Sequence, residues 1–145
     1  MGELIQADLS QIGIKVKLIT YDWPTYLSKS RTGDHPIIQM GWTGDNGDPD
    51  NFLGVLLGCS GIEGGSNLAR WCNPTFDKLI QEAKKLTVKS EREKKYKTAQ
   101  EIFHNEAPWV PIAHATTFRV FSNKIKNYKI DPFGGDVFNS IDLVE

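Results

Sequence analysis

The chain has 145 residues, of which 39% are hydrophobic and 24% are charged, and its formal net charge at pH 7 is -1. This composition is ordinary for a single globular domain. The near-neutral balance gives no electrostatic argument for binding to nucleic acid, and no apolar run approaches the roughly 20 residues of a membrane-spanning helix.

The first part of the chain is predicted to alternate helices and strands. Apolar residues at near-helical spacing predict a helix over residues 2–11, which Gly13 would end. Residues 14–20, IKVKLIT, alternate apolar and basic side chains, which predicts a strand with one buried face. A second helix, capped by Asp22, leads to a short apolar strand at residues 37–40. This order favours a βαβ crossover with neighbouring parallel strands.

Residues 41–50, GWTGDNGDPD, join the second predicted strand to the next helix. They contain three glycines, three aspartates and one tryptophan. Loops between a strand end and a helix carry binding chemistry in many α/β proteins. Three acids without a nearby base indicate a site for a positively charged group, and Asp48 or Asp50 is expected to cap the following helix.

The second half of the chain is predicted to be mainly helical. The expected helices are 52–57, 74–86 and 90–106, and the expected strands are 109–113 and 118–122. Ser90 and Glu93 have the spacing of a capping box at the start of the last helix. From residue 123 onward the chain has many apolar residues but neither a helical nor a strand period.

The two cysteines, Cys59 and Cys72, are 72 − 59 = 13 positions apart and flank a glycine-rich segment. A disulfide between them would contribute about 3 kcal/mol in the chain-entropy model. Two free thiols are the alternative, and the residues alone do not decide between them. A metal site is not expected, because no histidine or second cysteine pair lies nearby in the sequence.

Four stretches of the chain carry a resemblance to a known family. They are YDWPTYL at 21–27, GWTGDNGDPDNF at 41–52, GSNLARWCNPTFDKLI at 65–80 and APWVPIAHAT at 107–116. In this order they resemble stretches of the bacterial dipeptide-binding proteins, which are the periplasmic solute receptors of ABC importers. The haem- and glutathione-binding lipoproteins are similar to the same branch. The resemblance implies an α/β fold, namely part of the C-terminal lobe of a type II periplasmic-binding-protein-like structure, with a mixed sheet flanked by helices.

The resemblance also implies that the chain is a fragment, because family members are several times longer and close two lobes on a ligand. Residues 1–116 would form part of the second, C-terminal lobe. Residues 117–145 would be the hinge crossing and a C-terminal tail that returns to the missing first lobe. The family's arginine for the ligand carboxylate has no match in this sequence. Because the first lobe is missing, we expect the tail to leave apolar residues uncovered and the fragment to self-associate.

Asp45 is the main candidate binding residue, because the resemblance implies that it pairs with the α-ammonium of a ligand. The alternative is a turn cap. Trp42 and Trp23 resemble aromatic walls of the family's pocket, with core packing as the alternative for each. Met40 could line the pocket, although a place in the strand core is the stronger expectation.

The resemblance assigns roles to two glycines and to the cysteine pair. Gly41 and Gly44 would let the ligand backbone approach closely, and ordinary turn geometry is the alternative. Cys59 and Cys72 match a pair that is bridged in the dipeptide receptors. The resemblance therefore favours a disulfide, which fits a periplasmic protein.

The implied function is that of the substrate-binding component of an ABC peptide importer, which captures dipeptides or short peptides by their terminal ammonium. It would act in the periplasm, with a lipid anchor left open, and deliver its ligand to an inner-membrane permease. Binding of haem or glutathione is the alternative. No cofactor or nucleic acid is expected. An enzyme is not expected, because His35, His104 and His114 are scattered and form no nucleophile–base pair or metal motif.

Overall fold

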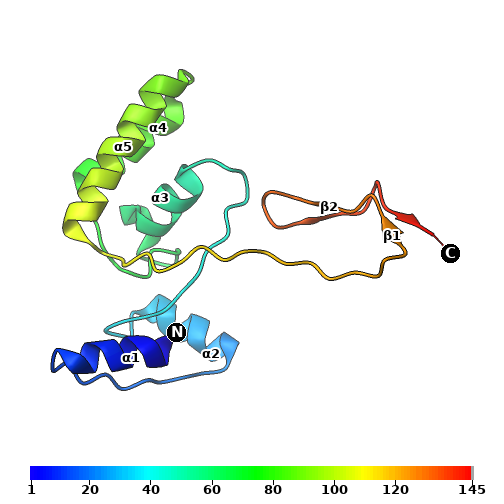
Figure 1. Cartoon of the computed structure of the whole chain (residues 1–145). Helices are drawn as coiled ribbons and strands as arrows, with labels where there is room; N and C mark the ends of the chain where they lie inside the picture. Colours follow the sequence, from blue (N-terminus) through cyan, green and yellow to red (C-terminus); the bar gives the residue numbers. More distant parts are fainter. Residues whose placement is uncertain (145) are drawn as a thin grey trace.

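The computed structural model describes residues 1–144, which form two groups of helices and a C-terminal arm (Figure 1). The first group contains α1 (Gly2–Gln11) and α2 (Trp23–Thr32). The second contains α3 (Asp50–Leu57), the 3₁₀ turn η1 (Cys59–Gly61), α4 (Pro74–Lys85) and α5 (Lys89–Glu106). The arm carries β1 (Ile125–Lys126), β2 (Lys129–Ile130), β3 (Asp136–Val137) and β4 (Asp142–Leu143). In Figure 1 the arm extends beyond both helical groups at the end of the long connection that follows α5, and its β2–β3 turn faces back toward the loop that leads into α3.

The first helical group follows the sequence predictions closely. An Asp22 carboxylate oxygen accepts a hydrogen bond from the Thr25 N–H at 3.1 Å and caps α2. Gly33 ends α2 in the left-handed conformation, with φ of 76°. The Gln6 side-chain amide donates to the Val16 carbonyl at 2.7 Å, which holds the segment between the helices against α1.

The main hydrophobic core lies where α3, α4 and α5 meet. Its fully buried members are Leu57, Phe76, Ile80, Ala83, Tyr96 and Ala99. Phe76, Ile80 and Ala83 recur at helical spacing, so α4 turns one continuous apolar face toward its neighbours. Burial of a large apolar side chain contributes about 1.5–3 kcal/mol, so this core is the main source of stability in the second helical group.

The ends of α4 and α5 differ in how well the sequence predicted them. The Asn73 side-chain oxygen accepts from the Thr75 and Phe76 N–H groups at 2.9 and 3.0 Å, which caps α4. The capping box predicted at Ser90 is wrong. The residue before α5 is Val88, which makes no side-chain cap, and Ser90 already lies inside the first helical turn.

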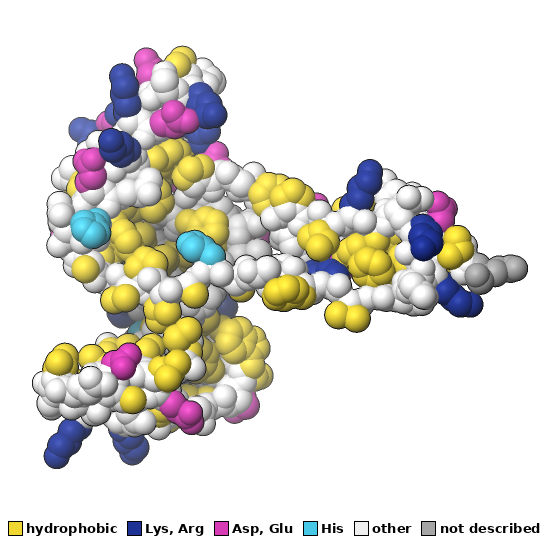
Figure 2. Space-filling view, in the orientation of Figure 1, with side chains coloured by type: hydrophobic (Ala, Val, Ile, Leu, Met, Phe, Trp, Pro, Cys, Tyr) yellow, Lys and Arg dark blue, Asp and Glu magenta, His cyan; other side chains and the backbone are white. Residues whose placement is uncertain are grey.

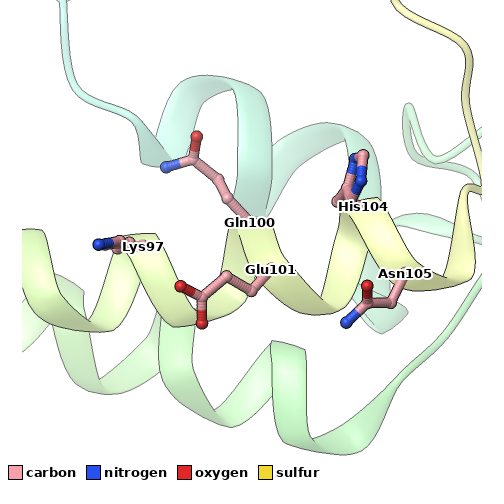
Figure 3. A pocket seen from close by; sticks show the side chains of 5 residues that line it. All are labelled: Lys97, Gln100, Glu101, His104 and Asn105. Atoms are coloured by element: carbon pink, nitrogen blue, oxygen red, sulfur yellow. The ribbon is translucent and has the colours of Figure 1, made fainter.

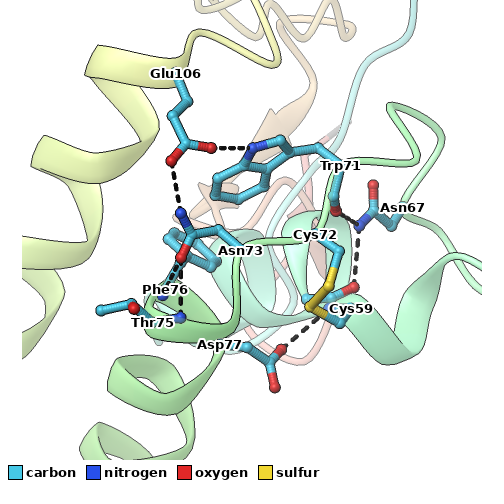
Figure 4. The surroundings of a disulfide bond; sticks show 10 residues. Cys59, Asn67, Trp71, Cys72, Asn73, Thr75, Phe76, Asp77 and Glu106 are labelled. Atoms are coloured by element: carbon cyan, nitrogen blue, oxygen red, sulfur yellow. Dashed lines mark hydrogen bonds between the residues drawn. A yellow bond between two sulfur atoms is a disulfide. The ribbon is translucent and has the colours of Figure 1, made fainter.

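The predicted disulfide between Cys59 and Cys72 is present, with a sulfur–sulfur distance of 2.07 Å (Figure 4). It ties η1 to the residues just before α4. The Cys59 N–H donates to the Asp77 carboxylate at 3.0 Å, so the same end of the bridge is also held by α4. The loop from 59 to 72 is thereby fixed at both ends to the helical core.

Two polar side chains organise the rest of this loop. Asn67 is buried, and its amide nitrogen donates to the carbonyls of Gly58 and Trp71 at 3.0 and 2.8 Å. The Glu106 carboxylate, at the end of α5, accepts from the Trp71 indole at 2.7 Å and from the Asn73 side chain at 2.6 Å (Figure 4). The disulfide loop therefore contacts α4 and α5 through polar bonds as well as through the bridge.

The strands predicted within residues 14–122 do not form in the described part of the chain. Residues 14–20, 37–40, 109–113 and 118–122 have no ladder partner among residues 1–144. A strand needs a neighbour for its backbone groups, and alternating side chains cannot supply one. Instead β1 pairs with β4 and β2 pairs with β3, both antiparallel, in the tail where no period was evident.

The unpaired segments leave apolar side chains in solvent. Val110 and Phe118 are each 80% exposed, and Val120 is 98% exposed. Figure 2 shows apolar side chains on the surface of both helical groups and along the arm. No helix within residues 1–144 has both the length and the apolar character needed to cross a bilayer.

Candidate ligand-binding site

Loop 41–50 runs from the first helical group to the start of α3, and the bonds of its own side chains shape it (Figure 1). The Asn46 side-chain oxygen accepts from the Asp48 N–H at 3.0 Å, and the Asp48 carboxylate accepts from the Asp50 N–H at 3.0 Å. These are two successive turns of the type that Asn and Asp side chains close. Gly47 is the central residue of the first turn and has a positive φ of 70°.

Asn51 brings two of the predicted site residues together. Its side-chain oxygen accepts from the Trp42 indole N–H at 2.9 Å and from the Asp45 backbone N–H at 3.3 Å. Its amide nitrogen donates to the Asp45 carboxylate at 3.4 Å. We call these three residues the Trp42–Asp45–Asn51 cluster. Asn51 was not among the site residues predicted from the sequence, although its amide in the first turn of the helix after the acidic loop was a usable signal.

The three loop aspartates differ in their partners. Asp48 makes an ion pair with Arg92 at 2.6 Å, and Asp50 makes one with Lys84 at 3.0 Å. Asp45 is exposed and has no such ion pair among residues 1–144. Of the three acids, Asp45 is therefore the one whose charge remains available to a cation from outside.

Asp48 has a structural role that differs from the predicted helix cap. The residue before α3 is Pro49, which makes no side-chain cap. The Arg92 guanidinium, the Asp50 N–H and the Tyr96 hydroxyl all donate to the Asp48 carboxylate, and Arg92 makes the largest contribution to lowering the pKa of Asp48. Asp48 thus fixes the loop to α5.

The two predicted site glycines lie in different surroundings. A Cβ atom at Gly44 would lie 2.7 Å from the Phe52 ring, so a larger residue there would have to displace that ring. A Cβ atom at Gly41 would meet nothing within 4 Å. Packing within the described residues therefore explains Gly44 and leaves Gly41 without a packing reason.

Gly47 packs against the arm, and its replacement gives a test of that contact. A Cβ atom at Gly47 would lie 3.0 Å from the Phe133 ring, in the turn between β2 and β3. We expect Gly47→Ala to lower the free energy of unfolding by about 1–2 kcal/mol for the left-handed backbone alone, and by more because Phe133 must move.

Gly64→Ala is the matched control for this variant. Gly64 has φ of 72°, and a Cβ atom added there would meet nothing within 4 Å, so this position carries the backbone cost without the contact. Urea unfolding of both variants measures how much more the free energy of unfolding falls in Gly47→Ala than in Gly64→Ala. Equal losses at the two positions would show that Phe133 does not press on the loop.

Trp23 and Met40 are not part of the Trp42–Asp45–Asn51 cluster in the structure. Trp23 begins α2, is 61% exposed, and stacks on Tyr26 with ring centroids 5.8 Å apart. The Tyr26 hydroxyl donates to the Gln39 carbonyl, which ties α2 to the segment leading into the loop. Met40 and Trp42 are partly exposed, so neither has the core position that was the alternative for each.

A shallow hollow lies on the outer face of α5, away from this cluster, and is lined by polar side chains (Figure 3). Its lining residues are Lys97, Gln100, Glu101, His104 and Asn105. These point outward from a single helix, as expected for a solvated face. No group of three or more potential metal ligands is present among residues 1–144.

The comparisons with known proteins agree on one family. Residues 1–64 match the family described as bacterial extracellular solute-binding proteins, family 5 Middle. The chain is 42% identical over 143 residues to a dipeptide-binding protein of Escherichia coli strain K12, covering 99% of this chain and 27% of that protein. It is 49% identical over 143 residues to heme-binding protein A of Haemophilus influenzae, covering 99% of this chain and 26% of that protein.

A solved structure shows the same arrangement of elements. The dipeptide-binding protein of Pseudoalteromonas sp. SM9913, in complex with Met-Leu, superposes with a TM-score of 0.90 at 35% identity and covers 99% of this chain and 28% of that one. Residues 1–64 match the family 5 model, and nearly the whole chain is similar to dipeptide-binding proteins. The chain spans about a quarter of the length of the curated relatives that it matches. The similarity to solute-binding proteins of known structure confirms the expected α/β class for the lobe, although the mixed sheet is not formed within residues 1–144.

Proposed function

We propose that this chain supplies one side of the binding site of a peptide receptor that serves an ABC importer. Asp45 would bind the terminal ammonium of a dipeptide or short peptide, with Trp42 beside the peptide side chain. The observation that carries this proposal is the single unpaired acid of the loop. Asp48 and Asp50 are each paired with a cation of the helical core, whereas Asn51 holds Asp45 in place without neutralising it.

The names of the relatives support a peptide ligand, because dipeptide- and di/tripeptide-binding proteins match nearly the whole chain. Gly41, Gly44, Trp23 and Met40 would complete this side of the site. The receptor would act in the periplasm, with or without a lipid anchor, and would pass its ligand to an inner-membrane permease. Solute-binding proteins of this family are transport proteins, and no catalytic role is proposed.

A second candidate ligand is haem, or glutathione. The 49% identity to heme-binding protein A favours keeping it, since that value exceeds the 42% identity to the dipeptide-binding protein of E. coli. The two candidates differ chemically. A dipeptide and glutathione carry an ammonium for Asp45, whereas haem carries none and would need a broad apolar surface.

Calorimetry on a chimera tests these ligands directly. In the chimera this chain replaces the matched segment of the E. coli dipeptide-binding protein, which supplies the rest of a complete receptor. Dipeptides, glutathione and haem are titrated in turn. Binding of dipeptides supports the proposal, and binding of haem alone would replace it with the second candidate.

We also propose that residues 1–116 are the lobe portion and that residues 117–145 cross toward the rest of a longer protein. On its own, the chain would then self-associate through apolar side chains such as Val110, Phe118 and Val120, which are exposed. Sedimentation velocity should show a mass that rises with concentration. A chimera that covers this surface should sediment as a monomer, and a monomeric isolated chain would contradict the proposal.

A further inference from the structure

Loop 41–50 is attached to the helical core through Asp48 and, at its last residue, through the Asp50–Lys84 ion pair. Arg92, which lies on α5 and 44 positions further along the chain, donates to one Asp48 carboxylate oxygen at 2.6 Å. The Tyr96 hydroxyl donates to the other oxygen at 3.1 Å. That second oxygen also accepts the Asp50 N–H, so both carboxylate oxygens are engaged.

Arg92 and Tyr96 are themselves held firmly. Tyr96 is only 4% exposed and belongs to the core between α4 and α5. Arg92 donates a second bond, from Nε to the Ala83 carbonyl in the last turn of α4, at 3.1 Å. Its guanidinium also lies over the Tyr96 ring, 5.5 Å from the centroid. The loop is therefore fixed to a rigid junction of two helices.

The attachment at Asp48 lies in the middle of the candidate site. Asp48 is three residues after Asp45 and three residues before Asn51. Asp45 and Asn51 are bonded to each other, and Asn51 holds the Trp42 indole. A shift of Asp48 would therefore move both ends of the Trp42–Asp45–Asn51 cluster.

We propose that Arg92 and Tyr96 are positioning residues for ligand binding, which act through Asp48 to hold the Trp42–Asp45–Asn51 cluster in its binding geometry. This proposal rests on the proposed function for its effect on affinity. Its structural part, the position of the cluster, stands independently of which ligand binds. Neither residue would touch the ligand.

A neighbouring ion pair on the same helix provides the control. Lys95, one turn from Arg92, pairs with Glu82 of α4 at 2.6 Å, and the two pairs have similar exposure. The Lys95–Glu82 pair joins α4 to α5 but does not contact the loop. A general effect on packing between these helices would appear in both variants, whereas an effect on the site should appear only at Arg92.

The first measurement uses this chain itself, labelled with ¹⁵N at tryptophan. The four indole N–H signals are assigned by single Trp→Phe replacements. In Arg92→Ala and Tyr96→Phe we expect the Trp42 signal to move and its hydrogen exchange to become faster. The Trp71 signal, bonded to Glu106, should stay in place and report that the core is intact. In Lys95→Ala neither signal should move.

The second measurement is dipeptide affinity in the chimera. Loss of a residue that orients a binding group weakens binding by about 10- to 100-fold in well-studied metal sites, and we expect a loss in this range for Arg92→Ala. Tyr96→Phe should give a smaller loss, Arg92→Lys should recover part of the affinity, and Lys95→Ala should bind within about twofold of the unchanged chimera.

The outcomes separate this proposal from the proposed function. If the unchanged chimera fails to bind dipeptides while the Trp42 signal still moves in Arg92→Ala, the peptide function is wrong and the positioning of the cluster stands. If the Trp42 signal stays fixed in both Arg92→Ala and Tyr96→Phe, the positioning proposal is overturned. An equal loss of affinity in Arg92→Ala and Lys95→Ala would also overturn it.

Discussion

Replacement of Asp45 by Asn is expected to remove most of the affinity for peptides with a free terminal ammonium. The side chain keeps nearly the same shape and loses only its charge. Removing one partner of a desolvated charge pair costs about 2–5 kcal/mol, which corresponds to a loss of roughly 30-fold or more in affinity. Calorimetry of the chimera with a dipeptide measures the loss.

Two controls make this result specific. An N-acetylated dipeptide has no ammonium, so it should bind weakly and equally to the unchanged chimera and to Asp45→Asn. Asp50→Asn removes a charge from the same loop, but that charge is already paired with Lys84. We expect Asp50→Asn to change stability more than affinity. If Asp45→Asn kept its dipeptide affinity, the assignment of the ammonium to Asp45 would be wrong.

The same variant also distinguishes the two candidate ligands. Haem has no ammonium, so its binding should survive in Asp45→Asn, whereas binding of dipeptides and glutathione should be lost together. A variant that lost all three ligands equally would indicate that Asp45 supports the fold of the loop. In that case the Trp42 indole signal should also have shifted, because Asn51 bonds to both residues.

The helices could be predicted from the sequence because their signals are local. The apolar spacing of α4 and the cap at Asp22 involve residues within a few positions of one another, and both were confirmed. The predicted strands failed for the opposite reason. Residues 109–113 and 118–122 have suitable side chains, but a strand also needs a partner, and no partner is found within residues 1–144.

The candidate site likewise has features that local sequence signals predict and features that they do not. The sequence marked loop 41–50 as acidic and fit for a cation, yet it could not by itself rank its three aspartates. The ranking depends on Arg92 and Lys84, which lie far along the chain and reach the loop only after α4 and α5 have packed. Long-range pairs of this kind have no local sequence signal, so the choice of Asp45 among the three aspartates came from the resemblance to a family.

Removal of the disulfide is expected to produce the largest loss of stability. In Cys59→Ser/Cys72→Ser the constraint on the unfolded chain is lost, and we expect the free energy of unfolding of the second helical group to fall by about 3 kcal/mol. Asn67, buried within the same loop, depends on that closure to place its amide nitrogen against Gly58 and Trp71. Urea unfolding followed by circular dichroism measures the change.

A reductant provides the internal control. Dithiothreitol should lower the stability of the unchanged chain to near that of the double variant and should leave the variant itself unaffected. Ser60→Ala, an exposed position in the same loop, should have little effect. A loss below about 1 kcal/mol, or a variant still sensitive to reductant, would contradict this expectation.

Removal of the disulfide should lower stability without moving the site, whereas replacement of a positioning residue should move the site. The bridge holds the loop from 59 to 72 against α4, whereas the Trp42–Asp45–Asn51 cluster is held through Asp48 by Arg92 and Tyr96. At low denaturant, where the double cysteine variant is still folded, the Trp42 indole signal should therefore keep its position while Arg92→Ala moves it. Stability and site geometry would then be shown to depend on different contacts of the same helical group.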